Sequence, residues 1–148
     1  MEDIQAQFQM LDSFVKEYSL KVFEKIEDNK EMNIKGKLAF RIVNITEQNN
    51  ILIGEIELIN ELEIMIKEEC KGTIKIIMGG LFQYSNKNEK EKFEEMLKIN
   101  GTTTLSHLIR TYIYTNTAIS GMPTIITPMI NFMEFFKEQE NEEKNKTT

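Results

Sequence analysis

Apolar and polar residues alternate at a period of two along much of the first half of this chain. Residues 5–22 carry most of their apolar side chains at even positions, and residues 34–42 repeat the pattern with basic side chains between them. Successive side chains of a β-strand point to opposite faces of the sheet. The pattern therefore predicts strands at 5–22 and 34–42, each with one apolar face. Leu11 and Val15 interrupt the first segment, so a helix remains an alternative there.

Two further strands follow, separated by polar turns. The third strand is predicted from Ile51 to Ile66, and its apolar parity changes at Gly54, which indicates a bulge there. The fourth begins at Thr73 and continues to Met78. Turns are predicted at 27–31, 48–50 and 68–72. The first half is thus predicted to form a four-stranded antiparallel sheet, as a meander or Greek key.

The hydrophobic period changes after Gly79-Gly80-Leu81-Phe82. Asn86 and Glu89 are spaced to cap a short helix, which Asn100-Gly101 is predicted to end. Residues 102–119 then place apolar side chains at helical spacing, and the Ser120-Gly121-Met122-Pro123 stretch ends this longer helix.

An irregular apolar segment from Pro123 leads into a last helix rich in phenylalanine and methionine. Asn131 and Glu134 have the spacing of a capping box, so this helix should begin near Asn131. Its apolar residues cover an arc of roughly 160°, wider than a short helix needs for docking. The helix therefore either closes the core or leaves part of a Met/Phe surface free for an apolar partner. The prediction is an α+β fold with a single domain at 1–136 and a disordered polar tail at 137–148.

Composition excludes several classes of function. The net charge of −6 argues against nucleic-acid binding and against anionic membranes. No apolar run approaches the roughly 20 residues of a membrane span, so no membrane insertion is expected. The acidic start Met1-Glu2-Asp3 has no signal-peptide layout, which predicts a cytoplasmic location. The single Cys70 and single His107 exclude an internal disulfide and ordinary zinc spacing, and no cofactor is expected.

No catalytic constellation is found either. His107 lies far from the apolar stripe of its helix, and Cys70 has no evident activating partner. Gly79-Gly80 lacks the spacing and lysine of a phosphate loop, and it predicts a strand bend or a close backbone approach. The chain is not predicted to be an enzyme.

The long helix has a second face of small polar and aromatic side chains where the rest of the protein carries Glu and Lys. This face is predicted to pack against another subunit. Its interface residues are Thr104, His107, Thr111, Tyr114 and Thr115, with Arg110 beside them.

The order of these segments resembles the SecB family of bacterial export chaperones. The resemblance runs from Phe8-Gln9-Met10 and Lys16-Glu17-Tyr18-Ser19-Leu20 through Gly79-Gly80-Leu81-Phe82 and Arg110. It continues through Gly121-Met122-Pro123 to Pro128, Asn131 and Phe132.

The resemblance implies helices packed on a four-stranded sheet and dimers that pair into a tetramer through the long helices. It also implies ATP-independent holding of unfolded polypeptides, which are either exported precursors or an antitoxin in a toxin–antitoxin–chaperone module. The family's acidic contacts for the secretion ATPase fall near Glu17, Lys21 and Lys75 here. Only the first is acidic, so contact with that motor is expected to be weakened.

The sequence therefore predicts a holdase that binds extended apolar segments through exposed hydrophobic surface and backbone hydrogen bonds. The alternative is a carrier for a small apolar ligand, with the same Met/Phe surface enclosing a pocket. The predicted client-binding residues are Leu38, Phe40, Ile42, Leu81, Phe82, Ile125, Ile126, Met129, Phe132, Phe135 and Phe136.

Overall fold

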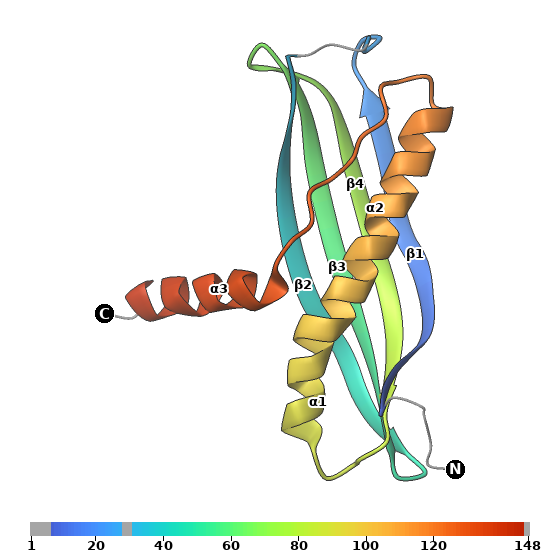
Figure 1. The fold of residues 1–148 in the computed structure, drawn as a ribbon, viewed down its shortest axis with the longest axis vertical. Helices are drawn as coiled ribbons and strands as arrows, with labels where there is room; N and C mark the ends of the chain where they lie inside the picture. Colours follow the sequence, from blue (N-terminus) through green and yellow to red (C-terminus); the bar gives the residue numbers. More distant parts are fainter. Residues whose placement is uncertain (1–6, 28–30, 147–148) are drawn as a thin grey trace.

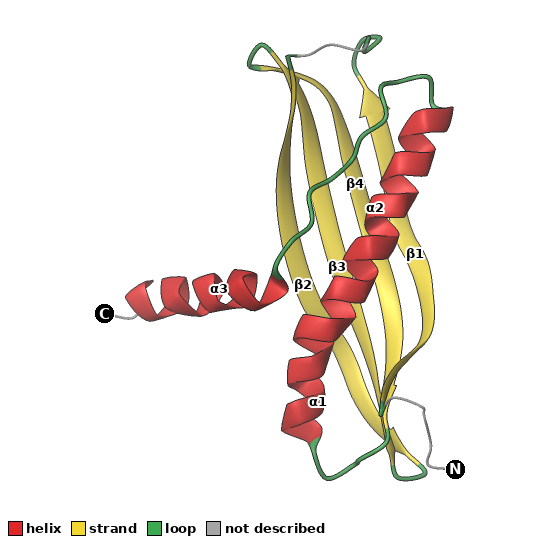
Figure 2. Ribbon diagram, in the orientation of Figure 1, coloured by secondary structure: helices red, strands yellow, loops and turns green. Residues whose placement is uncertain are grey.

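The computed structural model describes residues 7–27 and 31–146, and it consists of one antiparallel sheet with helices on one of its faces (Figures 1 and 2). The strands β1 (Phe8–Val22), β2 (Met32–Gln48), β3 (Ile51–Ile66) and β4 (Glu69–Tyr84) lie in the order β1-β4-β3-β2. The helices are α1 (Lys90–Met96), α2 (Thr102–Ile119) and α3 (Phe132–Lys146), and a π-helical turn, η1 (Leu97–Gly101), joins α1 to α2. The predicted α+β class, with a four-stranded antiparallel sheet, is confirmed.

The apolar core lies between the inner face of the sheet and helix α2. Even-numbered side chains of β3 and β4 point towards the helices, and those of Ile56, Ile76 and Phe82 are buried. The stripe of α2 that meets them contains Leu105, Ile109 and Ile113, each at most 1% exposed. The 3.6-residue period of α2 and the two-residue period of the strands thus bury their apolar faces against each other.

Strand β1 is a strand throughout, so the helical alternative for this segment is wrong. Its pairing with β4 skips one residue between Met10 and Asp12 and another between Val15 and Glu17. Each extra residue reverses the direction of the side chains that follow. Val15 therefore points inwards. Phe14 lies on the outer face opposite Gly79, although Phe8, which is also even-numbered, points inwards. The interruptions in the sequence pattern mark these bulges.

The bulge predicted at Gly54 is wrong. Strand β3 keeps one parity from end to end, and the extra residue lies on its neighbour, at Val43 of β2. Gly54 instead allows a close approach of α1 and η1. A Cβ atom at this position would lie 2.8 Å from Leu97 and 3.0 Å from Phe93.

The two turns that connect β2 to β3 and β3 to β4 have the same backbone shape. Asn49 and Asn50 have φ angles of 50° and 68°, as both central residues of a two-residue type I′ hairpin turn require, which confirms the turn at 48–50. Lys67 and Glu68 adopt 51° and 67°, so this turn lies earlier than the predicted 68–72. Lysine and glutamate rarely occupy this region, and the sequence therefore gave no turn signal at 67. Residues 28–30 of the turn predicted at 27–31 are outside the described ranges.

The sequence had suggested a break between α1 and α2 at Asn100-Gly101, and this prediction is wrong. The chain continues through η1, in which Gly101 is buried. A Cβ atom on Gly101 would lie 2.7 Å from Ile56 Cδ1 of β3, so close packing on the sheet requires glycine here. Gly101 has a right-handed helical conformation and therefore does not terminate the helix.

The tail predicted to be disordered from Lys137 is helical as far as Lys146, and its side chains are exposed. Glu, Lys and Gln favour helix, and Glu134 near the start and Lys146 near the end match the helix dipole. The predicted cap is confirmed, since the Glu134 backbone N–H donates to Asn131 Oδ1 at 3.3 Å. Thr147 and Thr148 are outside the described residues.

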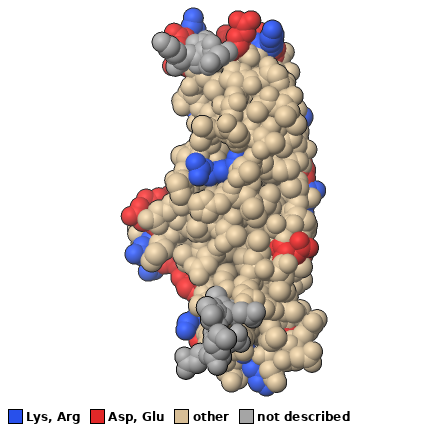
Figure 3. All heavy atoms as spheres, turned by 45° about the vertical axis from the view of Figure 1, so that its right-hand side comes forward, with Lys and Arg blue, Asp and Glu red and all other residues tan. Residues whose placement is uncertain are grey.

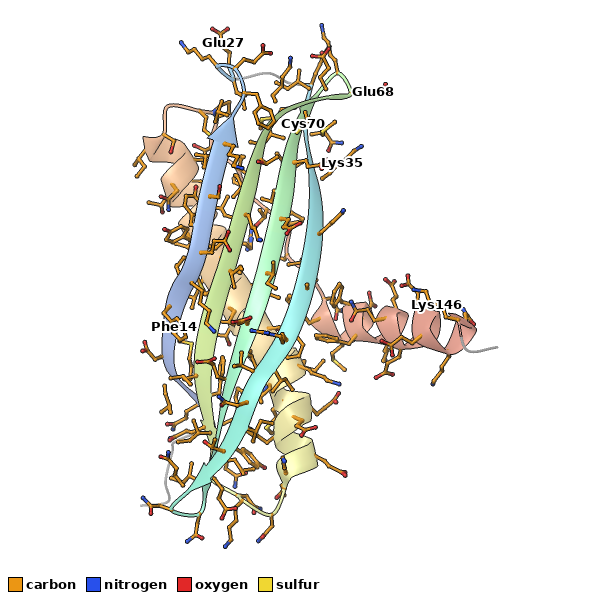
Figure 4. All side chains as sticks on the ribbon, turned by 180° about the vertical axis from the view of Figure 1, so that it is seen from behind. Phe14, Glu27, Lys35, Glu68, Cys70 and Lys146 are labelled. Atoms are coloured by element: carbon orange, nitrogen blue, oxygen red, sulfur yellow. The ribbon has the colours of Figure 1, made fainter. Side chains whose placement is uncertain are left out.

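None of the described helices covers the outer face of the sheet, seen in Figure 4, and ion pairs extend over this face from β1 to β2. Lys16 Nζ of β1 donates to Glu57 Oε1 of β3 at 2.5 Å, and Arg41 of β2 contacts Glu57 Oε2 at 2.8 Å. The Lys16 side chain crosses β4 at Gly79, where a Cβ atom would lie 3.1 Å from Lys16 Cε and 2.6 Å from the Phe14 ring. This confirms the close approach predicted for Gly79-Gly80. Glu57 is only 7% exposed, so its carboxylate is largely shielded from solvent although it lies on the outer face.

This network predicts an acid-dependent loss of stability. The hydrogen bond from Lys16, with the nearby Arg41, lowers the pKa of Glu57 although burial opposes the shift. A carboxyl with a lowered pKa stabilises the fold above its unfolded pKa of about 4.3, and this contribution is lost as the pH falls through the folded value. Glu57→Gln should cost about 1–2 kcal/mol at neutral pH and should flatten the fall in melting temperature between neutral pH and the acid range.

Thermal unfolding followed across this pH range checks the prediction. Glu61→Gln, on the same strand and the same face, is the matched control and should change the profile little. An unchanged acid limb in Glu57→Gln would contradict the assigned role of Glu57.

Candidate functional site

Four phenylalanines form an aromatic cluster where α3 meets strand β2. Phe40 of β2 lies 5.4 Å from Phe136 in an edge-to-face arrangement, and Phe135 lies 5.2 Å from Phe136. Phe132, at 2% exposure, is the buried member, and its ring is 6.0 Å from that of Phe135. Phe135 and Phe136 are half-buried. The first turn of α3 is thus anchored by Phe132 while its other two rings stay partly open to solvent.

The segment 120–131 connects α2 to α3 by crossing the inner face of the sheet, and we call it the strap (Figure 1). Ile125 and Thr127 are buried, whereas Ile126 and Met129 are 69% and 68% exposed. The strap is therefore an extended segment with an inner and an outer side. Beyond Ser120, which caps the end of α2, two hydrogen bonds tie the strap to this helix: the Ile125 backbone N–H donates to Thr117 Oγ1 at 3.0 Å, and Arg110 Nε donates to the Thr127 carbonyl at 2.8 Å.

The structure brings only part of the predicted client-binding set together. Leu38, Phe40 and Ile42 are half-buried on the inner side of β2, and they pack on the same core as Phe135 and Phe136. These five residues form one surface, which we call the β2–α3 surface. It combines an edge strand with the first turn of a helix.

The other predicted residues are placed differently. Phe82, Ile125 and Phe132 are buried core residues, at most 2% exposed, so they offer no free surface to a client. Leu81 is on the opposite, helix-free face, where it pairs with Asp12 and Glu55. Adjacent strand residues point to opposite faces, so Leu81 and Phe82 could not both belong to one groove.

Ile126 lies in a separate hollow of about 390 Å³ beside α2, which it shares with His107, Arg110, Thr111 and Tyr114. Met129 is exposed on the strap, and Met133, 56% exposed at the start of α3, adds an apolar side chain that the predicted set did not contain. Met133 belongs to the wide apolar arc of α3, which could have indicated from the sequence that this side chain is exposed.

The predicted interface residues of α2 lie on its outward side, where His107, Thr111, Tyr114 and Thr115 are exposed and Thr104 is half-buried. The hydroxyl of Thr104 donates to the Asn100 carbonyl at 2.8 Å, and that of Thr111 donates to the His107 carbonyl at 3.2 Å. Hydroxyls satisfied by their own helix leave the methyl groups facing outwards. Figure 3 shows that the side of the molecule towards which β1 and α2 lie carries few charged side chains. The α2 face is therefore less polar than its residue types suggest.

The three positions that the family resemblance assigned to secretion-ATPase contacts, as an expectation, lie together on the outer face of the sheet. Glu17, Lys21 and Lys75 all line one hollow of about 630 Å³. Lys75 Nζ is 3.8 Å from Glu17 and 4.0 Å from Glu61. Glu17, the one acid among these three positions, is thus partly neutralised by a neighbouring lysine.

No group for catalysis stands out among residues 7–27 and 31–146. In these ranges no cluster of three or more His, Cys, Asp or Glu side chains is placed to hold a metal ion. His107 is exposed, and the Cys70 thiol donates to the Gly72 carbonyl at 3.4 Å. None of the described helices combines the length and hydropathy needed to cross a bilayer.

Comparison with known proteins agrees with this architecture. The family model for SecB, described as preprotein translocase subunit SecB, matches residues 1–143. The chain belongs to the SecB family. No curated protein sequence matches this chain.

Among solved structures, this SecB-family chain is similar to the Mycobacterium tuberculosis Rv1957 SecB-like chaperone, in complex with a ChAD peptide from the Rv1956 HigA1 antitoxin. The TM-score is 0.63 at 15% sequence identity, with 84% of this chain and 91% of the mycobacterial chain covered. At this identity, the comparison supports the SecB-like fold.

Arg110 generates a prediction about the strap. It is the only charged residue on α2 besides the titratable His107, and sequence reasoning did not assign it a contact with the strap. Arg110→Ala removes one of the two hydrogen bonds that tie the strap to α2 and should speed amide exchange in residues 122–131. Hydrogen–deuterium exchange measures this effect, with His107→Ala as the control on the same helix. Equal exchange in both variants would show that Arg110 does not hold the strap.

Proposed function

We propose that this SecB-family chain is an ATP-independent holdase that binds extended apolar segments of non-native polypeptides on the β2–α3 surface. The observation that carries the proposal is the pair of half-buried rings, Phe135 and Phe136, against Phe40 of an edge strand. Aromatic side chains dominate many binding sites because they offer a large rigid apolar area. A client side chain that completes the burial of such rings would gain roughly 1.5–3 kcal/mol.

Two classes of client are included in the proposal: exported precursor proteins and an antitoxin. The mycobacterial chaperone bound to an antitoxin peptide supports the second class. Contact with the secretion ATPase should be weak, because Lys21 and Lys75 occupy positions where the family resemblance leads us to expect acids. No catalytic step is proposed, and the protein is expected to act in the cytoplasm.

Substitutions of Phe135 and Phe132 distinguish a loss of client binding from a loss of stability. Phe135→Ala should cost little stability, whereas Phe132→Ala should cost about 3–5 kcal/mol because it opens a cavity beside the helix cap. Phe135→Ala should nevertheless weaken the suppression of aggregation of an unfolded model protein. Phe23→Ala is the matched control, since Phe23 is 61% exposed at the end of β1, remote in the sheet from β2.

Thermal unfolding and aggregation assays run in parallel check this prediction. A strong loss of stability in Phe135→Ala with normal holding by the folded fraction would show that α3 is only part of the core. A protein that ignores unfolded clients and copurifies with a small apolar molecule would instead be the carrier.

The second part of the proposal is assembly as a dimer of dimers in which the outward side of α2 is buried. The methyl-rich threonine side chains and the absence of Asp and Glu from Thr102–Ile119 support this role. Thr111→Glu or Thr115→Glu would place an unpaired charge in that contact and should lower the oligomeric state. Light scattering at micromolar protein concentration measures the oligomeric state, and a monomeric unmodified protein would contradict the proposed assembly.

A further inference from the structure

Strand β2 is an edge of the sheet with one side unpaired. Among the described residues it pairs only with β3, and its 17 residues make it the longest strand of the sheet. Residues 32–46 contain no proline and no acidic residue. A long edge without proline presents a row of free N–H and C=O groups on which another strand can pair.

Helix α3 lies under this edge on the inner side of the sheet. The Phe40–Phe136 contact joins the two elements, and α3 then projects outwards past β2 (Figures 1 and 4). A strand added beside β2 would therefore have α3 below it. Its inward side chains would meet the half-buried rings of Phe135 and Phe136.

The opposite side of the same edge is basic. Lys35, Lys37 and Arg41 alternate with the inward residues of β2, and all three are exposed on the outer face (Figure 4 labels Lys35). Within residues 7–27 and 31–146, neither Lys35 nor Lys37 forms an ion pair. Arg41 contacts Glu57 but keeps 64% of its side chain exposed. On β3, Glu63, Glu61 and Glu57 lie opposite these three residues, so the positive charge of the outer face is on the side of the free edge.

We propose that the client adds as a β-strand to the free edge of β2, and that clients with acidic residues on the outward side are preferred. This inference rests on the proposed holdase function and adds a rule for its substrates. The preferred segment alternates apolar and acidic residues: apolar side chains pack on Phe135 and Phe136, and carboxylates face Lys35, Lys37 and Arg41. Opposite charges on neighbouring strands attract each other, and like charges repel.

Lysines on an edge strand can also serve only to prevent unwanted pairing. An edge protected in that way would repel basic strands but would not bind acidic strands more tightly. Here the basic row is combined with an aromatic surface on the inner side of the same edge, so that both faces of an incoming amphipathic strand have a matching partner. Charge complementarity therefore favours an acidic polypeptide segment as the occupant.

The test uses the full chain and two labelled peptides of about nine residues, enough to span Lys35 to Arg41 at about 3.3 Å per residue. Both carry the same apolar residues at alternate positions, with glutamate between them in one and lysine in the other. Fluorescence anisotropy at low salt should give at least about fivefold tighter binding of the glutamate peptide. The preference should shrink in high salt because exposed charges are screened.

A double variant, Lys35→Glu with Lys37→Glu, should remove or reverse the preference. The neutral variant Lys35→Gln with Lys37→Gln should remove it, and it serves if the charge reversal disturbs folding. Lys21→Glu, on the outer face of the other edge strand, is the matched control and should leave the preference unchanged. N-methylation of alternate peptide amides should abolish binding in one register only, because only every second N–H faces β2.

Equal affinity for the two peptides, or a preference that survives both double variants, overturns the inference. Tolerance of N-methyl groups in both registers overturns strand addition. An unmodified protein that binds neither peptide but still holds an unfolded model protein overturns the inference and leaves the proposed function intact. Failure to hold the unfolded protein as well removes the proposed function itself.

Discussion

The close packing of α2 on β4 and β3 determines how the rest of the inner face is covered. Gly101 lies against Ile56 at the start of this contact, and Leu105, Ile109 and Ile113 continue it along the helix. A helix with its side chains is about 10–12 Å wide, whereas four strands at about 4.8 Å spacing extend about 14 Å between the axes of the outer two. One helix therefore cannot bury the whole face, and the part over β2 needs another cover.

The strap and the first turn of α3 provide that cover, and they do so incompletely. The strap has no regular hydrogen-bond ladder, and its identified ties to α2 are those of Ile125 and Thr127. Phe132 fills the last core position, while Phe135 and Phe136 remain half-buried beside Phe40. Rings in this position stabilise the docked helix with part of their area and leave the remainder for a partner. A surface of this kind can hold a non-native chain without any chemical step.

Much of the architecture could be predicted from the sequence because two periods, two and 3.6, separate the strands from the helices. Several of the errors concern features that depend on partners distant in the sequence. Leu11 and Val43 are the extra residues of two bulges, and only the pairing with the neighbouring strand shows where such a residue lies. Gly54 is required because α1 packs closely on it. The turn at Lys67 and Glu68 carries no local signal, since neither residue favours a positive φ.

The candidate site shows the same division. The aromatic residues of α3 and the inward residues of β2 could be grouped from composition and parity, and the structure brings Phe40 and Phe136 into contact. Parity alone could have excluded Leu81 once Phe82 was assigned inwards. The depth of burial of Ile125 and Phe132 could not be predicted, because it depends on the path of the strap across the sheet.

The outward side of α2 shows how residue type and surface character can differ. Thr104 and Thr111 are polar residues, yet their hydroxyls donate to carbonyls one turn earlier in the helix. Those hydroxyls need no partner from outside, so contact with another apolar surface would leave them satisfied. Charges are concentrated instead on the outer face of the sheet, on α1 and on α3 beyond Phe136. The chain thus separates three surfaces: an uncharged helix face, a mixed-charge sheet face, and between them an edge strand that is apolar on one side and basic on the other.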